Sequence, residues 1–259
     1  MKGALLIVEK EMLELRRSPA LLLSMLSLPA AMVAVPVGLV AWLDHKAPPQ
    51  AVYYLQELYG ISAPHGLIGV LVGAVAKNWL PLFLILPIFL PILLAAQSIG
   101  GERERRTLEP LLATPVSTLE IIVGKSLAAV VPSLLITWIA AALFCGGINL
   151  LAAGRLAAPL PDGPWLFGCL VLAPLLALFG NAMAVVVSSK VLDARAAQNL
   201  AAMTVMPLLG LVVVQIAGRI SLGPRFYASF ALAAAAADVA LIALAVRWFD
   251  REALLTRWR

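Results

Sequence analysis

GGERERRTLEPLLATPVSTLEIIVGK, at residues 100–125, is the one long charged stretch of this chain with an apolar segment of membrane length on each side. WLPLFLILPIFLPILLAAQ (79–97) precedes it, and SLAAVVPSLLITWIAAALF (126–144) follows it. Unpaired charge is costly inside a bilayer, so this stretch must lie in water. It therefore predicts two membrane-spanning helices joined by a polar hinge, which is placed to bind a second protein.

The composition is that of a membrane protein. Of the 259 residues, 62% are hydrophobic and 13% are charged, whereas an average soluble domain has about 25% charged residues. Apolar runs of about 20 residues recur, and each is long enough to cross the hydrocarbon as a helix. The runs are continuously apolar rather than alternating, which excludes a β-barrel. We therefore expect an all-α polytopic membrane protein.

The apolar runs predict a single transmembrane domain, residues 1–259. Its six spans are expected at 20–43, 79–97, 126–148, 165–187, 200–217 and 226–246. Within the polar segment 44–78, GLIGVLVGAVA (66–76) is too short to span and is predicted to be re-entrant or interfacial. Gly100 and Gly101 are expected to end the second span, because glycine commonly follows a helix C-terminus.

Charge placement orients these spans. Of the 19 Lys and Arg residues, 14 lie in the two termini and in the hinges 100–125 and 188–199, and 5 lie in the opposite loops. Positive residues are enriched in cytoplasmic loops. Both termini and both hinges are therefore expected on the cytoplasmic side of the membrane. We expect this membrane to be a bacterial inner membrane. No basic cluster is interleaved with aromatic residues, so nucleic acid is not an expected partner.

Residues 1–19 predict an amphipathic helix on the membrane surface. Its apolar residues recur every three or four positions, at Leu5, Val8, Met12 and Leu15. The opposite side carries Lys10, Glu14 and Arg17. EKEMLE stands where a signal peptide would be cleaved, which excludes a signal peptide. The alternative interpretation is a solvated extension of the first span.

The hinge itself predicts a short amphipathic helix at the cytoplasmic surface. Leu108, Leu111 and Leu112 share one helical face, and Pro115 ends the element. Ser117 and Glu120 then form a capping box that opens the third span. Such a helix suits the groove of a partner protein. The alternative is a solvated turn with a leucine patch.

The hinge resembles the signature of type-2 ABC exporter permeases, the six-span subunits of type V ABC transporters. The matching residues are Glu102, Arg103, Glu104, Thr107, Leu108, Glu109, Leu111, Leu112, Pro115, Val116, Ser117, Glu120, Ile121, Gly124 and Lys125. The chain departs from the pattern at Arg106, where the family usually has glycine. IVEKEMLELRRSPALL (7–22) resembles the first amphipathic helix of the same family.

This resemblance implies a permease that dimerises, with itself or with a second permease, and that binds two ABC ATPase subunits. Contacts with the ATPase would come from Glu102, Arg103, Glu104, Arg105, Arg106, Thr107, Leu108, Glu109, Leu111, Leu112 and Thr114. Secondary contacts would come from Lys10, Glu14, Arg17, Lys190, Asp193 and Arg195. The chain has no phosphate-binding loop. It is therefore expected to be a transport subunit rather than an enzyme, with ATP and Mg²⁺ bound by its partner and no cofactor of its own.

Three polar residues within the predicted spans are candidates for a translocation pathway. Asp238 is a carboxylate deep in the sixth span. An acid inside the membrane is a functional candidate by default, as a cation contact or a proton carrier. The alternatives are an acid hydrogen-bonded between helices and one kept protonated by the low dielectric. Asn181 and Gln215 are weaker candidates, for which helix packing is the stronger interpretation.

The sequence gives less support to a metal site, a disulfide or another class of membrane protein. His45 and His65 share a loop without a carboxylate cluster, so no metal site is expected. Cys145 and Cys169 are two buried thiols or, as the weaker alternative, a disulfide. A secondary transporter driven by an ion gradient would use Asp238, but this function does not explain the amphipathic hinge. An intramembrane hydrolase would need a Ser–His pair or paired acids at membrane depth. Permeases of the family that the hinge resembles are associated with drugs, lipids, polysaccharides and ions.

Overall fold

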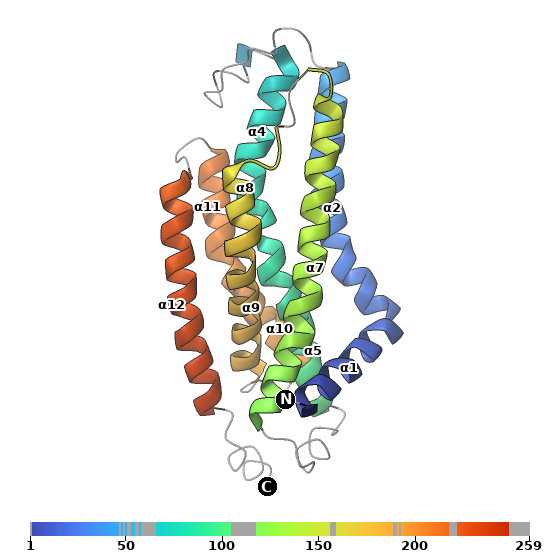
Figure 1. Cartoon of the computed structure of the whole chain (residues 1–259), viewed down its shortest axis with the longest axis vertical. Helices are drawn as coiled ribbons and strands as arrows, with labels where there is room; N and C mark the ends of the chain where they lie inside the picture. The colour runs from blue at the N-terminus through green and yellow to red at the C-terminus, as the bar shows by residue number, and fades with distance from the viewer. Residues whose placement is uncertain are drawn as a thin grey trace.

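The computed structural model in Figure 1 describes most of the chain. The described residues are 2–46, 48, 50, 53, 54, 57, 66–104, 118–155, 159–188, 191, 193–217 and 222–248. They form a helical bundle in which six helical segments are long and apolar enough to cross a membrane. The prediction of an all-α polytopic membrane protein is therefore confirmed. The short amphipathic helix predicted in the hinge 100–125 falls mostly on residues 105–117, which lie outside the described residues.

The elements keep the chain order of the predicted spans. They are α1 (Lys2–Arg17), α2 (Pro19–Lys46), α4 (Gly66–Phe83), α5 (Ile85–Glu104), α7 (Thr118–Ala152), α8 (Gly163–Phe167), the π-helical turn η1 (Gly168–Leu172), α9 (Ala173–Ser188), α10 (Ala194–Ala202), the 3-10 turn η2 (Met203–Val205), α11 (Met206–Ile216) and α12 (Pro224–Trp248). α1 lies obliquely across one end of the bundle (Figure 1), which we call the proximal end; the opposite end is the distal end.

The second span is longer than predicted. α4 and α5 join at Leu84 into one candidate span, Gly66–Ala96. The segment 66–76 is the first half of α4, so the prediction that it is re-entrant is wrong. The sequence is interrupted there by Lys77 and Asn78, but the Asn78 amide donates to the Ala74 carbonyl of its own helix at 2.8 Å. A side-chain amide satisfied in this way can remain in an apolar span.

The helix of the second span also ends later than predicted. α5 continues through Gly100 and Gly101 to Glu104, so the prediction that these glycines end the helix is wrong. A glycine destabilises a helix by about 1 kcal/mol relative to alanine. α5 packs against α7, α9 and α10, and that tertiary packing outweighs the local preference.

The remaining spans also extend past their predicted limits. The third candidate span is Glu120–Ala152, and the fourth, Gly163–Ser188, is made of α8, η1 and α9. α10 begins at Ala194, inside the segment predicted as the second hinge, and η2 and α11 continue it to Ile216. Asp193 caps α10, which explains why the helix starts there.

The core of the bundle lies around α4 and α5. In the most apolar window of this span 78% of residues are buried, against 17% for α2 and 22% for α12. α2 and α12 accordingly lie toward opposite edges of the bundle in Figure 1. Three buried aromatic rings join α4, α7 and α8: Phe144 stacks on Trp165 with ring centroids 4.8 Å apart, and Phe83 contacts both rings.

In the irregular part of the fourth span, a tryptophan of α7 donates a hydrogen bond to a backbone carbonyl. In η1 the N–H of Ala173 donates to Gly168, five residues back, and Pro174 has no N–H to offer to Cys169. The Cys169 carbonyl instead accepts the indole N–H of Trp138, from α7, at 2.8 Å. Cys145 and Cys169 are free thiols, so the disulfide alternative is wrong.

Candidate functional site

α1 packs against the start of α7, but not with all of its predicted apolar side, since Leu5 is 67% exposed. Ala4 and Ile7 are buried there. A side chain at Gly124 of α7 would place its Cβ 2.9 Å from both the Ala4 carbonyl oxygen and Ile7 Cβ. Glycine at 124 therefore permits a close approach of the two helices. Ser18 separates α1 from α2, and α1 lies at an angle to α2 (Figure 1).

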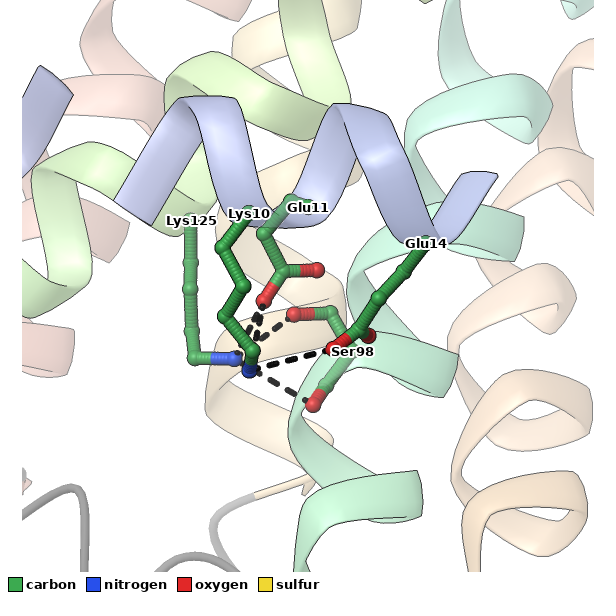
Figure 2. Close-up of polar contacts among 5 residues, drawn as sticks. All are labelled: Lys10, Glu11, Glu14, Ser98 and Lys125. Carbon is green, nitrogen blue, oxygen red and sulfur yellow. Dashed lines mark hydrogen bonds and ion pairs between the residues drawn. The ribbon is translucent and has the colours of Figure 1, made fainter. Parts of the chain in front are cut away.

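Lys125 joins α1, α5 and α7 at the proximal end (Figure 2). Its ammonium group donates to Glu11 Oε1 of α1 at 2.8 Å, to Ser98 Oγ of α5 at 2.8 Å and to the Ser98 carbonyl at 3.3 Å. Lys125 is only 4% exposed. We call Lys125, Glu11 and Ser98 the Lys125 cluster.

The stability of the Lys125 cluster depends on the presence of all its charged and polar partners. A lysine ammonium has three N–H donors, and three acceptor atoms surround this one. The Glu11 side chain is also mostly buried. A buried ion pair is strongly destabilised by loss of one partner, because the other charge is left uncompensated in a low-dielectric site. The three helices are therefore held together by interdependent contacts of the Lys125 ammonium group.

The predicted secondary contacts of α1 lie beside this cluster. The Lys10 ammonium is 3.5 Å from Glu14 Oε1 and 3.9 Å from Glu11 Oε1 (Figure 2). Glu14 and Arg17 are exposed. The charged edge of α1 thus remains at the surface next to a buried ion pair.

The predicted contacts of the first hinge are only partly described. Glu102, Arg103 and Glu104 form the last turn of α5. Arg105, Arg106, Thr107, Leu108, Glu109, Leu111, Leu112 and Thr114 lie outside the described residues. The helices on either side of this hinge, α5 and α7, pack against each other.

The second hinge contributes a capped helix start. The Asp193 carboxylate accepts the backbone N–H of Arg195 at 2.8 Å, as expected of a helix N-cap. Both residues are exposed. Lys190 lies outside the described residues. Asp193 therefore has a local structural role in addition to the predicted partner contact.

The structure places the three pathway candidates in different surroundings. Asn181 donates to Ser126 Oγ of α7 at 2.9 Å, and Gln215 donates to Asn78 Oδ1 of α4 at 3.4 Å. Asp238 is 4% exposed, and neither of its carboxylate oxygens has a hydrogen-bond partner among the described residues. Asn181 and Gln215 thus connect helices, whereas Asp238 is a buried acid without such a connection.

Sequence reasoning missed the Lys125 cluster. Lys125 was identified only as a residue of the family signature, and no role was predicted for Glu11. A usable signal existed: on a helical wheel Glu11 falls between Ile7 and Leu15, on the apolar side of α1. A carboxylate at such a position requires a buried partner.

One comparison with known proteins identifies a family for this chain. The family model described as "ABC-2 family transporter protein" matches residues 5–228. A comparison with curated proteins gives no match. The family match covers α1, all of the spans up to the start of α12 and the hinge between α5 and α7. This chain therefore belongs to the ABC-2 family of membrane transporter proteins.

Proposed function

We propose that the chain is the permease subunit of an ATP-driven ABC exporter, which works as a dimer with two separate ATPase subunits. The observation that carries this proposal is the family match across residues 5–228. The convergence of α1, α5 and α7 at one end of the bundle supports it, because a partner bound to the hinge would contact all three helices.

The proximal end faces the cytoplasm in this proposal, and the membrane is the bacterial inner membrane. Both termini and both hinges carry most of the positive charge of the chain, and positive loops favour the cytoplasmic side. An ATPase needs cytosolic ATP, so the hinge must lie on the same side. The two arguments lead to the same orientation.

ATP binding would act by moving the hinge. Segment 105–117 connects α5 directly to α7, so a displacement of the hinge displaces the proximal ends of both helices. Small movements at an interface are converted into helix and domain rearrangements when packed elements have two stable arrangements. The pathway would open between two permease subunits, identical or different, with the ATP sites in the partner ATPase.

An ion-gradient-driven secondary transporter is the second candidate function. The observation that favours it is Asp238, whose buried carboxylate has no hydrogen-bond partner among the described residues. This function needs no ATPase partner and no coupling hinge. The two functions are therefore separated by the dependence of the protein on an ATPase.

Copurification tests the proposal directly. The permease would be tagged and coexpressed with a candidate ABC ATPase from the same genome, and the amount of bound ATPase and the ATP hydrolysis rate would be measured. We expect a complex, and we expect Glu102→Ala with Glu109→Ala to lower both quantities. The exposed distal substitution Lys46→Met is the control. Absence of ATPase from the wild-type protein would reject the exporter proposal and favour the secondary transporter.

A further inference from the structure

The Lys125 cluster closes the base of the coupling hinge. Ser98 lies about two helical turns before segment 105–117, and Lys125 lies about two turns after it. The hydrogen bonds between them at 2.8 and 3.3 Å therefore bridge the two helices from which the hinge emerges. The same ammonium group reaches Glu11 on α1. The buried Lys125 side chain thus attaches α1 to the base of the hinge.

We propose that Lys125 is a positioning residue that transmits movement of the hinge to α1, so that α1 moves together with α7 when the ATPase acts. This inference rests on the proposed function, because it deepens the role of the hinge. Lys125 does not contact ATP or the transported molecule in this mechanism. It acts by holding α1 on α7 while the hinge moves.

Packing around Gly124 supports a rigid connection between α1 and α7. Any Cβ at this position would be 2.9 Å from the backbone oxygen of Ala4, so α1 lies directly on the backbone of α7. α1 cannot slide along α7 without bringing a larger residue against Ala4 or Ile7. The contact therefore has one register, which the bond from Lys125 to Glu11 maintains.

α7 is also attached to α2 at the distal end. Arg155 Nη1, just beyond the end of α7, lies 2.8 Å from both carboxylate oxygens of Asp44 in α2. Between these two ends, a Cβ at Gly147 would be 3.0 Å from Val37. α1, α2 and α7 are therefore connected at the proximal end, along the membrane and at the distal end. We expect them to move as one unit.

Spin labels test this unit without knowledge of the substrate. Cys145 and Cys169 would be replaced by alanine, and labels attached to exposed positions as the pairs Leu6→Cys with Leu127→Cys and Leu6→Cys with Leu200→Cys. Distances would be measured in the permease–ATPase complex with and without ADP–vanadate trapping. We expect the α1–α7 distance to stay constant and the α1–α10 distance to change. A change of the α1–α7 distance as large as that of the α1–α10 distance would overturn the inference.

Substitutions distinguish a role of Lys125 in transmitting movement to α1 from a role in the stability of the fold. Lys125→Met should keep the ATPase bound but broaden the α1–α7 distance and abolish the α1–α10 change on trapping, whereas the control Lys46→Met should behave as wild type. The pair Lys125→Met with Glu11→Gln removes the uncompensated charge, so it should recover thermal stability without recovering the distance change. A double variant that recovers both would show that Lys125 only stabilises the fold, and the inference would be wrong.

The outcomes also distinguish the two proposals. If the wild-type permease binds no ATPase, the exporter proposal fails. If it binds the ATPase but Lys125→Met traps with the same distances as Lys46→Met, the exporter proposal survives and only the role of Lys125 is rejected.

Discussion

The indole N–H of Trp79 in α4 donates to the backbone carbonyl of Met32 in α2 at 3.0 Å. Met32 is four residues before Pro36, which lies inside α2. A proline inside a helix removes the N–H that would bond the carbonyl four residues back. Trp79 thus supplies the donor that Pro36 lacks, and it joins the second span to the first.

Trp79→Phe should lower stability because it keeps an aromatic ring but removes the indole donor. The Met32 carbonyl would lose its partner in an environment without water, an expected loss of about 1–3 kcal/mol. The measurement is the midpoint of thermal unfolding in detergent, followed by intrinsic fluorescence. The matched control is Trp42→Phe, a tryptophan of α2 that is 61% exposed, which should leave the midpoint unchanged. Equal effects of both substitutions would contradict this role of Trp79.

Gly180→Ala should destabilise the contact between α5 and α9. An added Cβ at Gly180 would overlap the carbonyl oxygen of Ile88, and a forced displacement of packed helices destabilises by about 1–3 kcal/mol. Gly210→Ala is the control, because no atom lies within 4 Å of its added Cβ. We expect a lower unfolding midpoint for the first variant and an unchanged or higher midpoint for the second. The reverse order would show that α5 and α9 are farther apart.

Asp238→Leu should raise the stability of the isolated permease. The buried carboxylate has no hydrogen-bond partner among the described residues, and replacing an unsatisfied polar group by an apolar one of similar size removes a penalty of about 1–3 kcal/mol. Asp238→Asn keeps a polar group there and should give a smaller change. Thermal unfolding of both variants checks the order. A fall in the midpoint for Asp238→Leu would mean that the carboxyl group has a stabilising contact.

Asp44→Asn should have a small effect that depends on salt. The Arg155 side chain is 52% exposed, and exposed ion pairs contribute about 0.2–1 kcal/mol. High ionic strength screens such pairs, so the difference between Asp44→Asn and wild type should shrink in concentrated salt. Lys125→Met provides the comparison: its partner is buried, the expected loss is about 3–5 kcal/mol, and salt should hardly change it. The unfolding midpoints of both variants at low and high salt measure this contrast.

The described structure shows why some segments were predicted and others were missed. The spans followed from length and apolarity, because a bilayer imposes both on any helix that crosses it. Segment 66–76 was misassigned because Lys77 and Asn78 interrupt the apolar run, and only the fold shows that Asn78 bonds to its own helix and accepts from Gln215. Gly100 and Gly101 were misassigned because a local preference was used where the packing of α5 decides.

By itself the sequence determined the membrane class, the helical architecture, the six crossings and the resemblance of residues 100–125 to an exporter family, since these depend on composition and on local patterns. Only the tertiary structure decided which side chains meet. Lys125 and Glu11 are 114 positions apart, and no local pattern states the register in which α1 lies on α7. That register is set by the close approach at Gly124. It places the charges of Lys125 and Glu11 together at the base of the hinge, where each is buried only because the other is present.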